Sequence, residues 1–123
     1  MPTVVVMAAH GSRAEAANTA HRELVDAVAA HSPAPVVPAF LELAEPSIPA
    51  AVDAVVADGS TQVLVLPYFL HPGRHLAEDL TGIVADATER HPGVRVRLLD
   101  LFGADRALAA LVVAQISTAL NPD

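Results

Sequence analysis

The sequence of 123 residues contains no cysteine and no lysine. Without cysteine there is no disulfide framework, thiol nucleophile, iron–sulfur cluster or cysteine-ligated zinc, so any metal chemistry must use histidines and carboxylates. All seven basic residues are arginines, and fourteen acidic residues bring the net charge to -7. Because an acidic chain has no long-range attraction for a polyanion, we expect no general nucleic-acid binding.

The sequence also lacks long apolar runs and several familiar enzyme motifs. Its apolar stretch at residues 4–9 is too short to span a bilayer and has no charged segment before it. We therefore expect no signal peptide and no membrane anchor, with the cytoplasm as the default location. The motifs GxSxG, GxxxxGK[ST] and GxGxxG are absent, which argues against a serine hydrolase or a P-loop enzyme.

Apolar residues are abundant and arranged in alternating strand and helix patterns. They make up 53% of the chain against 17% charged residues, which predicts a single compact domain over residues 1–123. The β-branched run at residues 3–9 is typical of a strand buried on both faces of a parallel sheet. Ala17, Ala20, Leu24 and Val28 recur at helical spacing and predict a helix over residues 14–30.

The same alternation continues to the end of the chain. It predicts strands at residues 36–41, 62–68 and 94–99, and helices at residues 47–57, 75–90 and 104–120. Single helices between strands imply right-handed crossovers. The expected fold is therefore α/β: an open parallel four-stranded sheet of (βα)4 type with helices on both faces.

Polar side chains follow the predicted strands, at the sheet edge where ligands bind in such folds. His10 follows the first strand, Glu42 and Glu45 follow the second, and His71 and His75 follow the third. Three histidines and two glutamates are therefore expected to meet at one edge.

Each of these residues also has a simpler interpretation. His10 is either a metal ligand or base, or a loop residue that caps the next helix. Spacing alone suits His75 equally as a ligand and as a helix-terminus residue, whereas His71 fits a loop residue better than a ligand. Glu42 and Glu45 fit both site carboxylates and solvated loop residues. The other histidines are expected on helix surfaces or ends: His21, His31 and His91.

Three segments together resemble a known family. AHGSR at residues 9–13, FLELAEPSIPAAV at residues 40–52 and VLPYFLHPGRHLAEDL at residues 65–80 resemble, in order and spacing, the small sirohydrochlorin chelatases of the CbiX type. The resemblance covers nearly the whole chain. It implies a single chelatase-like domain that corresponds to one flavodoxin-like half of the longer family members. It implies insertion of a divalent metal into sirohydrochlorin, the tetrapyrrole shared by the cobalamin and sirohaem pathways. Co²⁺, Fe²⁺ or Ni²⁺ would be a substrate, with no permanently bound cofactor.

The resemblance also implies roles for individual residues. His10 matches the metal ligand and proton acceptor, and His75 matches the second metal ligand. The positions expected to contact substrate are Glu45, Leu70, His71, Pro72, Gly73, Arg74 and His75. Glu42 is a further candidate carboxylate. We expect Arg13 and Arg74 to offset the negative charge of the substrate's carboxylates.

Half-length members of this family resemble homodimers in which two copies replace a tandem duplication. The candidate surface is an apolar stripe on the final helix: Leu108, Leu111, Val112, Ile116 and Leu120, with Val113 beside them. For most of these residues we expect packing on the chain's own sheet, so the dimer expectation rests chiefly on the family resemblance. The competing function is a non-enzymatic flavodoxin-like module that binds a tetrapyrrole or a metal without turnover.

Overall fold

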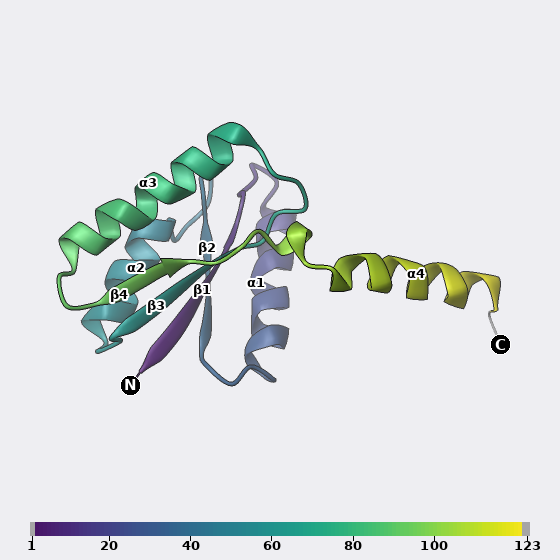
Figure 1. Cartoon of the computed structure of the whole chain (residues 1–123), viewed down its shortest axis with the longest axis horizontal. Helices are drawn as coiled ribbons and strands as arrows, with labels where there is room; N and C mark the ends of the chain where they lie inside the picture. The colour runs from purple at the N-terminus through teal and green to yellow at the C-terminus, as the bar shows by residue number, and fades with distance from the viewer. Residues whose placement is uncertain (1, 122–123) are drawn as a thin grey trace.

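The computed structural model describes residues 2–121 and contains a parallel sheet of four strands in the order β2-β1-β3-β4 (Figure 1). The strands are β1 (Thr3–Ala9), β2 (Val36–Phe40), β3 (Gln62–Pro67) and β4 (Arg95–Leu98). The helices are α1 (Glu15–Ala29), α2 (Ile48–Ala57), α3 (Arg74–Arg90) and α4 (Ala107–Leu120), with a short 3-10 helix η1 (Phe102–Ala104) before α4. The predicted βα order is confirmed, with small shifts at the ends of elements.

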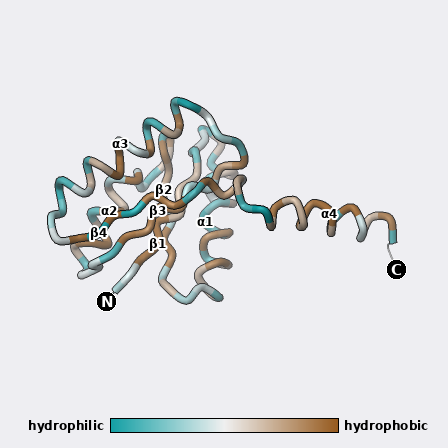
Figure 2. Tube along the Cα trace, in the orientation of Figure 1, coloured by the Kyte–Doolittle hydropathy of each residue, from teal (hydrophilic) through white to brown (hydrophobic). Residues whose placement is uncertain are grey.

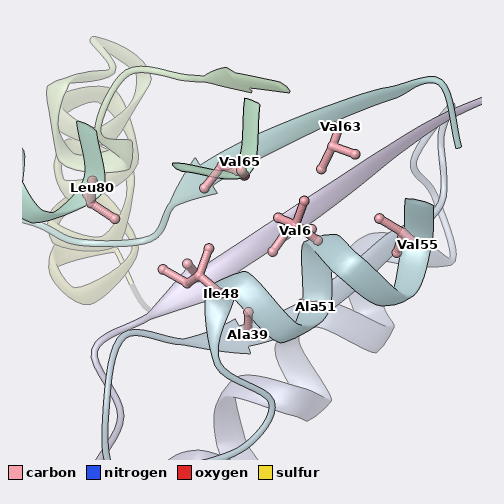
Figure 3. Close-up of a cluster of buried hydrophobic side chains, with 11 residues drawn as sticks. Val6, Ala39, Ile48, Ala51, Val55, Val63, Val65 and Leu80 are labelled. Atoms are coloured by element: carbon pink, nitrogen blue, oxygen red, sulfur yellow. The ribbon is translucent and has the colours of Figure 1, made fainter. Parts of the chain in front are cut away.

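The main core lies between the sheet and the helices α2 and α3 (Figure 3). β1 is central: Val5 is paired with Val36 of β2 on one side and with Leu64 of β3 on the other. Because side chains alternate along a strand, every second residue of β1 and β3 faces this core. The buried cluster comprises Val6, Ala8, Ala39, Ile48, Ala51, Val52, Val55, Val63, Val65, Leu80 and Ala87.

Helix α1 covers the other face of the sheet, but through residues that differ from those expected. Its buried residues are Asn18, His21 and Val25, whereas Ala17 and Ala20 are exposed. The reason is that both polar side chains find partners inside: Asn18 bonds to the backbone of the loop after β1, and the Nε2 atom of His21 lies 3.0 Å from the carbonyl oxygen of Met7. The prediction that His21 lies on a helix surface is therefore wrong.

Helix α4 does not pack on the sheet. It extends away from the rest of the chain (Figure 1) and has no buried residue. Figure 2 shows strongly hydrophobic residues along this projecting helix, and its exposed side chains include Leu111, Val112, Val113, Ile116 and Leu120. The expectation that most of this stripe packs on the chain's own sheet is therefore wrong.

Among the described residues 2–121, α1 packs mainly on β2, so the same face of the sheet lacks a covering helix at β3. Leu64 and Leu66 alternate with the core residues Val63 and Val65, so they lie on the α1 face, where they are only half-buried. None of the helices in residues 2–121 has the length and apolar character needed to cross a membrane.

Candidate functional site

The loops that follow β1 and β2 lie against each other at the carboxyl edge of the sheet. The Leu41 N–H donates to the Ala9 carbonyl at 2.9 Å, and the Glu42 N–H donates to the His10 carbonyl at 3.0 Å, so hydrogen bonds join the two segments beyond the ends of both strands. Gly11 lies here at φ 94°, and a Cβ atom at this position would overlap the Glu42 carbonyl group. Only glycine allows this close approach without displacing a loop.

This pairing brings together two of the predicted site residues. The Nε2 atom of His10 lies 3.3 Å from the Oε1 atom of Glu42, and the two side chains remain 61% and 57% exposed. The His10 ring also meets the ring of Phe69, just after β3, in an edge-on arrangement with centroids 5.9 Å apart. An imidazole, a carboxylate and an aromatic ring from the ends of three neighbouring strands therefore converge on an open surface.

The loop after β3 is supported by the 3-10 helix η1. The Gly103 N–H donates to the Phe69 carbonyl at 2.9 Å, and a Cβ atom on Gly103 would overlap the backbone of Leu70. The centroids of the Tyr68 and Phe102 rings lie 4.9 Å apart. The chain after β4 therefore holds the start of the loop that carries the remaining predicted site residues.

The predicted substrate positions in this loop are exposed: Leu70, His71, Pro72, Gly73, Arg74 and His75. His75 is the second residue of α3, and Arg74 approaches Glu78 of the same helix at 3.6 Å. Glu45 and Arg13 are exposed on their own loops. Within residues 2–121 no three histidine or acidic side chains gather closely enough to hold a metal ion. The assignment of His10 and His75 as joint ligands stays a prediction.

Two hollows adjoin His10 and Glu42. One, on the α1 face, has a volume of about 420 Å³ and is lined by Ala9, His10, Gly11, Ser12, Ala17, Asn18, Ala20, His21, Leu24, Phe40 and Tyr68. The other, of about 440 Å³, lies between the β2 loop and α3 and contains four carboxylates, from Glu42, Glu78, Asp79 and Asp86. Carboxylates gathered in a groove attract cations. The groove beside Glu42 is therefore acidic.

Sequence reasoning missed a set of α1 residues beside the site. Glu15, Asn18 and Arg22 are joined by side-chain hydrogen bonds, and they lie three and four residues apart, on one face of the helix. The bonds from Arg22 and Asn18 lower the pKa of the Glu15 carboxyl below its ordinary value. The spacing was visible in the sequence, but it is equally typical of a solvated helix face, so only the structure connects it to the site.

Similar proteins share this arrangement of strands and loops. The solved CbiX protein of Marinobacter aquaeolei superposes with a TM-score of 0.86 at 27% identity, covering 99% of this chain and 100% of that one. The sirohydrochlorin chelatase SirB from Bacillus subtilis subspecies spizizenii, solved in complex with cobalt, superposes with a TM-score of 0.84 at 28% identity, covering 95% of this chain and 50% of that one. The fold is therefore an α/β chelatase fold.

The sequence comparison leads to the family. The chloroplastic sirohydrochlorin ferrochelatase of Arabidopsis thaliana is 34% identical over 118 residues, which are 95% of this chain and 52% of that protein. This chain spans about half the length of that curated relative. The CbiX family model matches residues 4–119, and the chain belongs to the CbiX family. The resemblance identified from the sequence motifs is confirmed.

Proposed function

We propose that the protein inserts a divalent metal ion, cobalt, iron or nickel, into sirohydrochlorin. The observation that carries the proposal is the pair of His10 and Glu42, held 3.3 Å apart at the edge of a chelatase fold. The pair is open to solvent, as a site must be if it receives a metal ion and passes it to a macrocycle. Imidazole and carboxylate ligands suit these metals.

Metal insertion requires that two protons leave the macrocycle as the metal ion enters it. The reaction is balanced when M²⁺ and the free tetrapyrrole give the metallated tetrapyrrole and two protons. In this proposal, neutral His10 binds the incoming metal ion or accepts a pyrrole proton, and Glu42 provides a second acceptor 3.3 Å away. His75 supplies the second metal ligand. A few protein ligands leave coordination positions open, so the metal ion can be released to the tetrapyrrole nitrogens.

The substrate carries carboxylates, whereas the chain is acidic, so binding needs local positive charge. Arg13 and Arg74 are exposed on the loop after β1 and at the start of α3. We propose that both arginines bind carboxylates of the substrate. Glu45 and the loop from Leu70 to His75 provide the remaining substrate contacts. The approach of Arg74 to Glu78 at 3.6 Å is an exposed pair within one helix, which is weak enough to exchange for a substrate carboxylate.

We also propose that two copies of the chain form the working enzyme. A four-stranded sheet is only a few strand spacings of about 4.8 Å across, which is narrow for a tetrapyrrole. The helix α4 consists of apolar and uncharged residues and has no buried residue, although helices of this composition are normally covered. Each copy also has an incompletely covered part of its sheet, where Leu64 and Leu66 of β3 are only half-buried.

A second copy is the partner that fits both unpartnered surfaces. The structural match covers 100% of the Marinobacter aquaeolei CbiX chain but only 50% of the SirB chain. The other half of SirB is therefore long enough for a second unit of this size. In a two-fold arrangement, α4 of each copy would contact the same surface of the other, as closed symmetry requires. We also propose that the protein acts in the cytoplasm.

The experiment that tests the activity is anaerobic incubation of the protein with sirohydrochlorin and Co²⁺, Fe²⁺ or Ni²⁺, followed by absorbance. We expect the spectrum of the metallated product to appear faster than in the protein-free control and to continue through many turnovers. A spectral shift that stops at one equivalent of tetrapyrrole would instead support the non-enzymatic binding module and contradict a chelatase.

A further inference from the structure

One hydrogen-bonded chain of side chains on α1 connects the two loops that carry His10 and Glu42. Asn18 is only 2% exposed. Its Oδ1 atom accepts from the Ser12 N–H at 2.9 Å, and its Nδ2 atom donates to the Ser12 carbonyl at 2.8 Å. This paired bond fixes the backbone two residues after His10.

The series of hydrogen bonds continues from Asn18 to the loop after β2. The Nδ2 atom of Asn18 also donates to Glu15 at 3.2 Å, and Arg22 donates from Nη1 to the other oxygen of Glu15 at 2.7 Å. The Nη2 atom of Arg22 then donates to the Glu45 carbonyl at 3.1 Å, and its guanidinium carbon lies 5.1 Å from the centre of the Phe40 ring. We call Glu15, Asn18 and Arg22 the α1 clamp.

The α1 clamp matters because the two side chains proposed to react, those of His10 and Glu42, are exposed. His10 and Glu42 are both more than half exposed, so burial does not fix their orientation. Their positions depend instead on the backbone of the two loops, which the clamp holds at Ser12 and at Glu45. Ligand groups must be held to within about 0.5 Å to bind a metal ion productively.

We propose that Asn18 and Arg22 are positioning residues for the metal-insertion site, acting through the loop backbones rather than by touching the metal ion or the tetrapyrrole. The inference rests on the proposed function, because it assigns these residues to the same site. Outer residues that orient metal ligands commonly change metal affinity or activity by about 10- to 100-fold when they are replaced.

The test compares Arg22→Met with Arg90→Met. Arg22→Met keeps an apolar stem against Phe40 and removes the hydrogen bonds to Glu15 and Glu45. Arg90→Met removes a similar exposed ion pair, to Asp53 at 2.9 Å, from the end of α3. Asn18→Asp is the second variant: it keeps an acceptor for the Ser12 N–H, but it loses the donor and places a carboxylate beside Glu15.

We expect Arg22→Met and Asn18→Asp to raise the KM for Co²⁺ about tenfold or more. A smaller folded fraction would lower the maximal rate but not change this constant. Hydrogen exchange of the backbone amides at residues 10–15 and 41–46 should become faster in these variants. Arg90→Met should keep the wild-type KM for Co²⁺ and wild-type exchange in both loops.

The outcomes separate this inference from the proposed function. A wild-type protein that metallates sirohydrochlorin, together with clamp variants whose KM for Co²⁺ and loop exchange match those of Arg90→Met, would overturn the clamp alone. A wild-type protein that does not metallate sirohydrochlorin would overturn the proposed function, and with it the positioning role of the clamp.

Discussion

The position of His10 depends on its neighbour Gly11, which has no side chain. Its imidazole meets Glu42 because Gly11 lets the two loops approach, and any side chain at position 11 would overlap the Glu42 carbonyl group. Glycine is the residue type that permits such a close approach, and the structure identifies the Glu42 carbonyl as the group that is approached. The distance between the two side chains could not be predicted, because it depends on the parallel pairing of β1 with β2.

The first prediction concerns the two proposed metal ligands. If His10 and His75 present the metal ion together, His10→Ala and His75→Ala should each lower the metallation rate by more than about tenfold, and the double variant should lose little more. The reason is that either substitution already disables the shared step. Steady-state rates measured by absorbance with each metal ion provide the check.

His31→Ala is the matched control, because His31 is an exposed histidine beyond the end of α1. It should retain the wild-type rate. Losses that simply multiply in the double variant would indicate that His10 and His75 have separate roles, and an unchanged rate in either single variant would remove that residue from the ligand set.

At the scale of elements, the strands were more predictable than the faces of the helices. The β-branched run of β1 leaves little alternative to a buried strand, and it is confirmed at Thr3–Ala9. The buried side of α1 differs from its apolar stripe by one position, because Asn18 and His21 are stabilised inside by bonds to backbone groups outside the helix, in β1 and the loop after it. Such partners belong to the tertiary structure and leave no periodic signal.

An ion-pair cluster that joins α2 to α3 gives the second prediction. The Oδ1 atom of Asp53 lies 2.6 Å from Nε2 of His91 and accepts from Arg90 at 2.9 Å. The hydrogen bond from His91, followed by that from Arg90, lowers the pKa of the Asp53 carboxyl below its ordinary value of 3.8. The carboxyl is therefore more acidic in the folded state than in the unfolded state.

A lowered carboxyl pKa contributes stability that is present above the unfolded value and is lost as the pH falls through the folded value. We expect Asp53→Asn to be less stable than the wild type near neutral pH, and the difference to shrink below about pH 3.8. Urea unfolding at a series of pH values measures this difference. Asp26→Asn, an exposed position on α1, is the control, and a difference for Asp53→Asn that stays constant from neutral pH to acid would contradict the linkage.

For the whole molecule, the third prediction is that the protein is a dimer held by α4. Sedimentation at micromolar concentration should give the mass of two chains. Leu111→Glu and Ile116→Glu place a charge on the exposed apolar surface of α4 and should give the mass of one chain with reduced metallation. Gln115→Glu adds the same charge at a polar position and should remain a dimer. A wild-type protein with the mass of one chain and full activity would show that a single copy suffices.

The projection of α4 also makes its secondary structure depend on protein concentration. An isolated helix of its length, 14 residues, is marginal in water, because nucleation is costly and packing normally supplies the stability. A helix that obtains this packing only from another copy follows the law of mass action, so dilution should uncoil it while the sheet persists. Far-ultraviolet ellipticity would then decrease on dilution before the main unfolding transition, and the unfolding midpoint would rise with protein concentration.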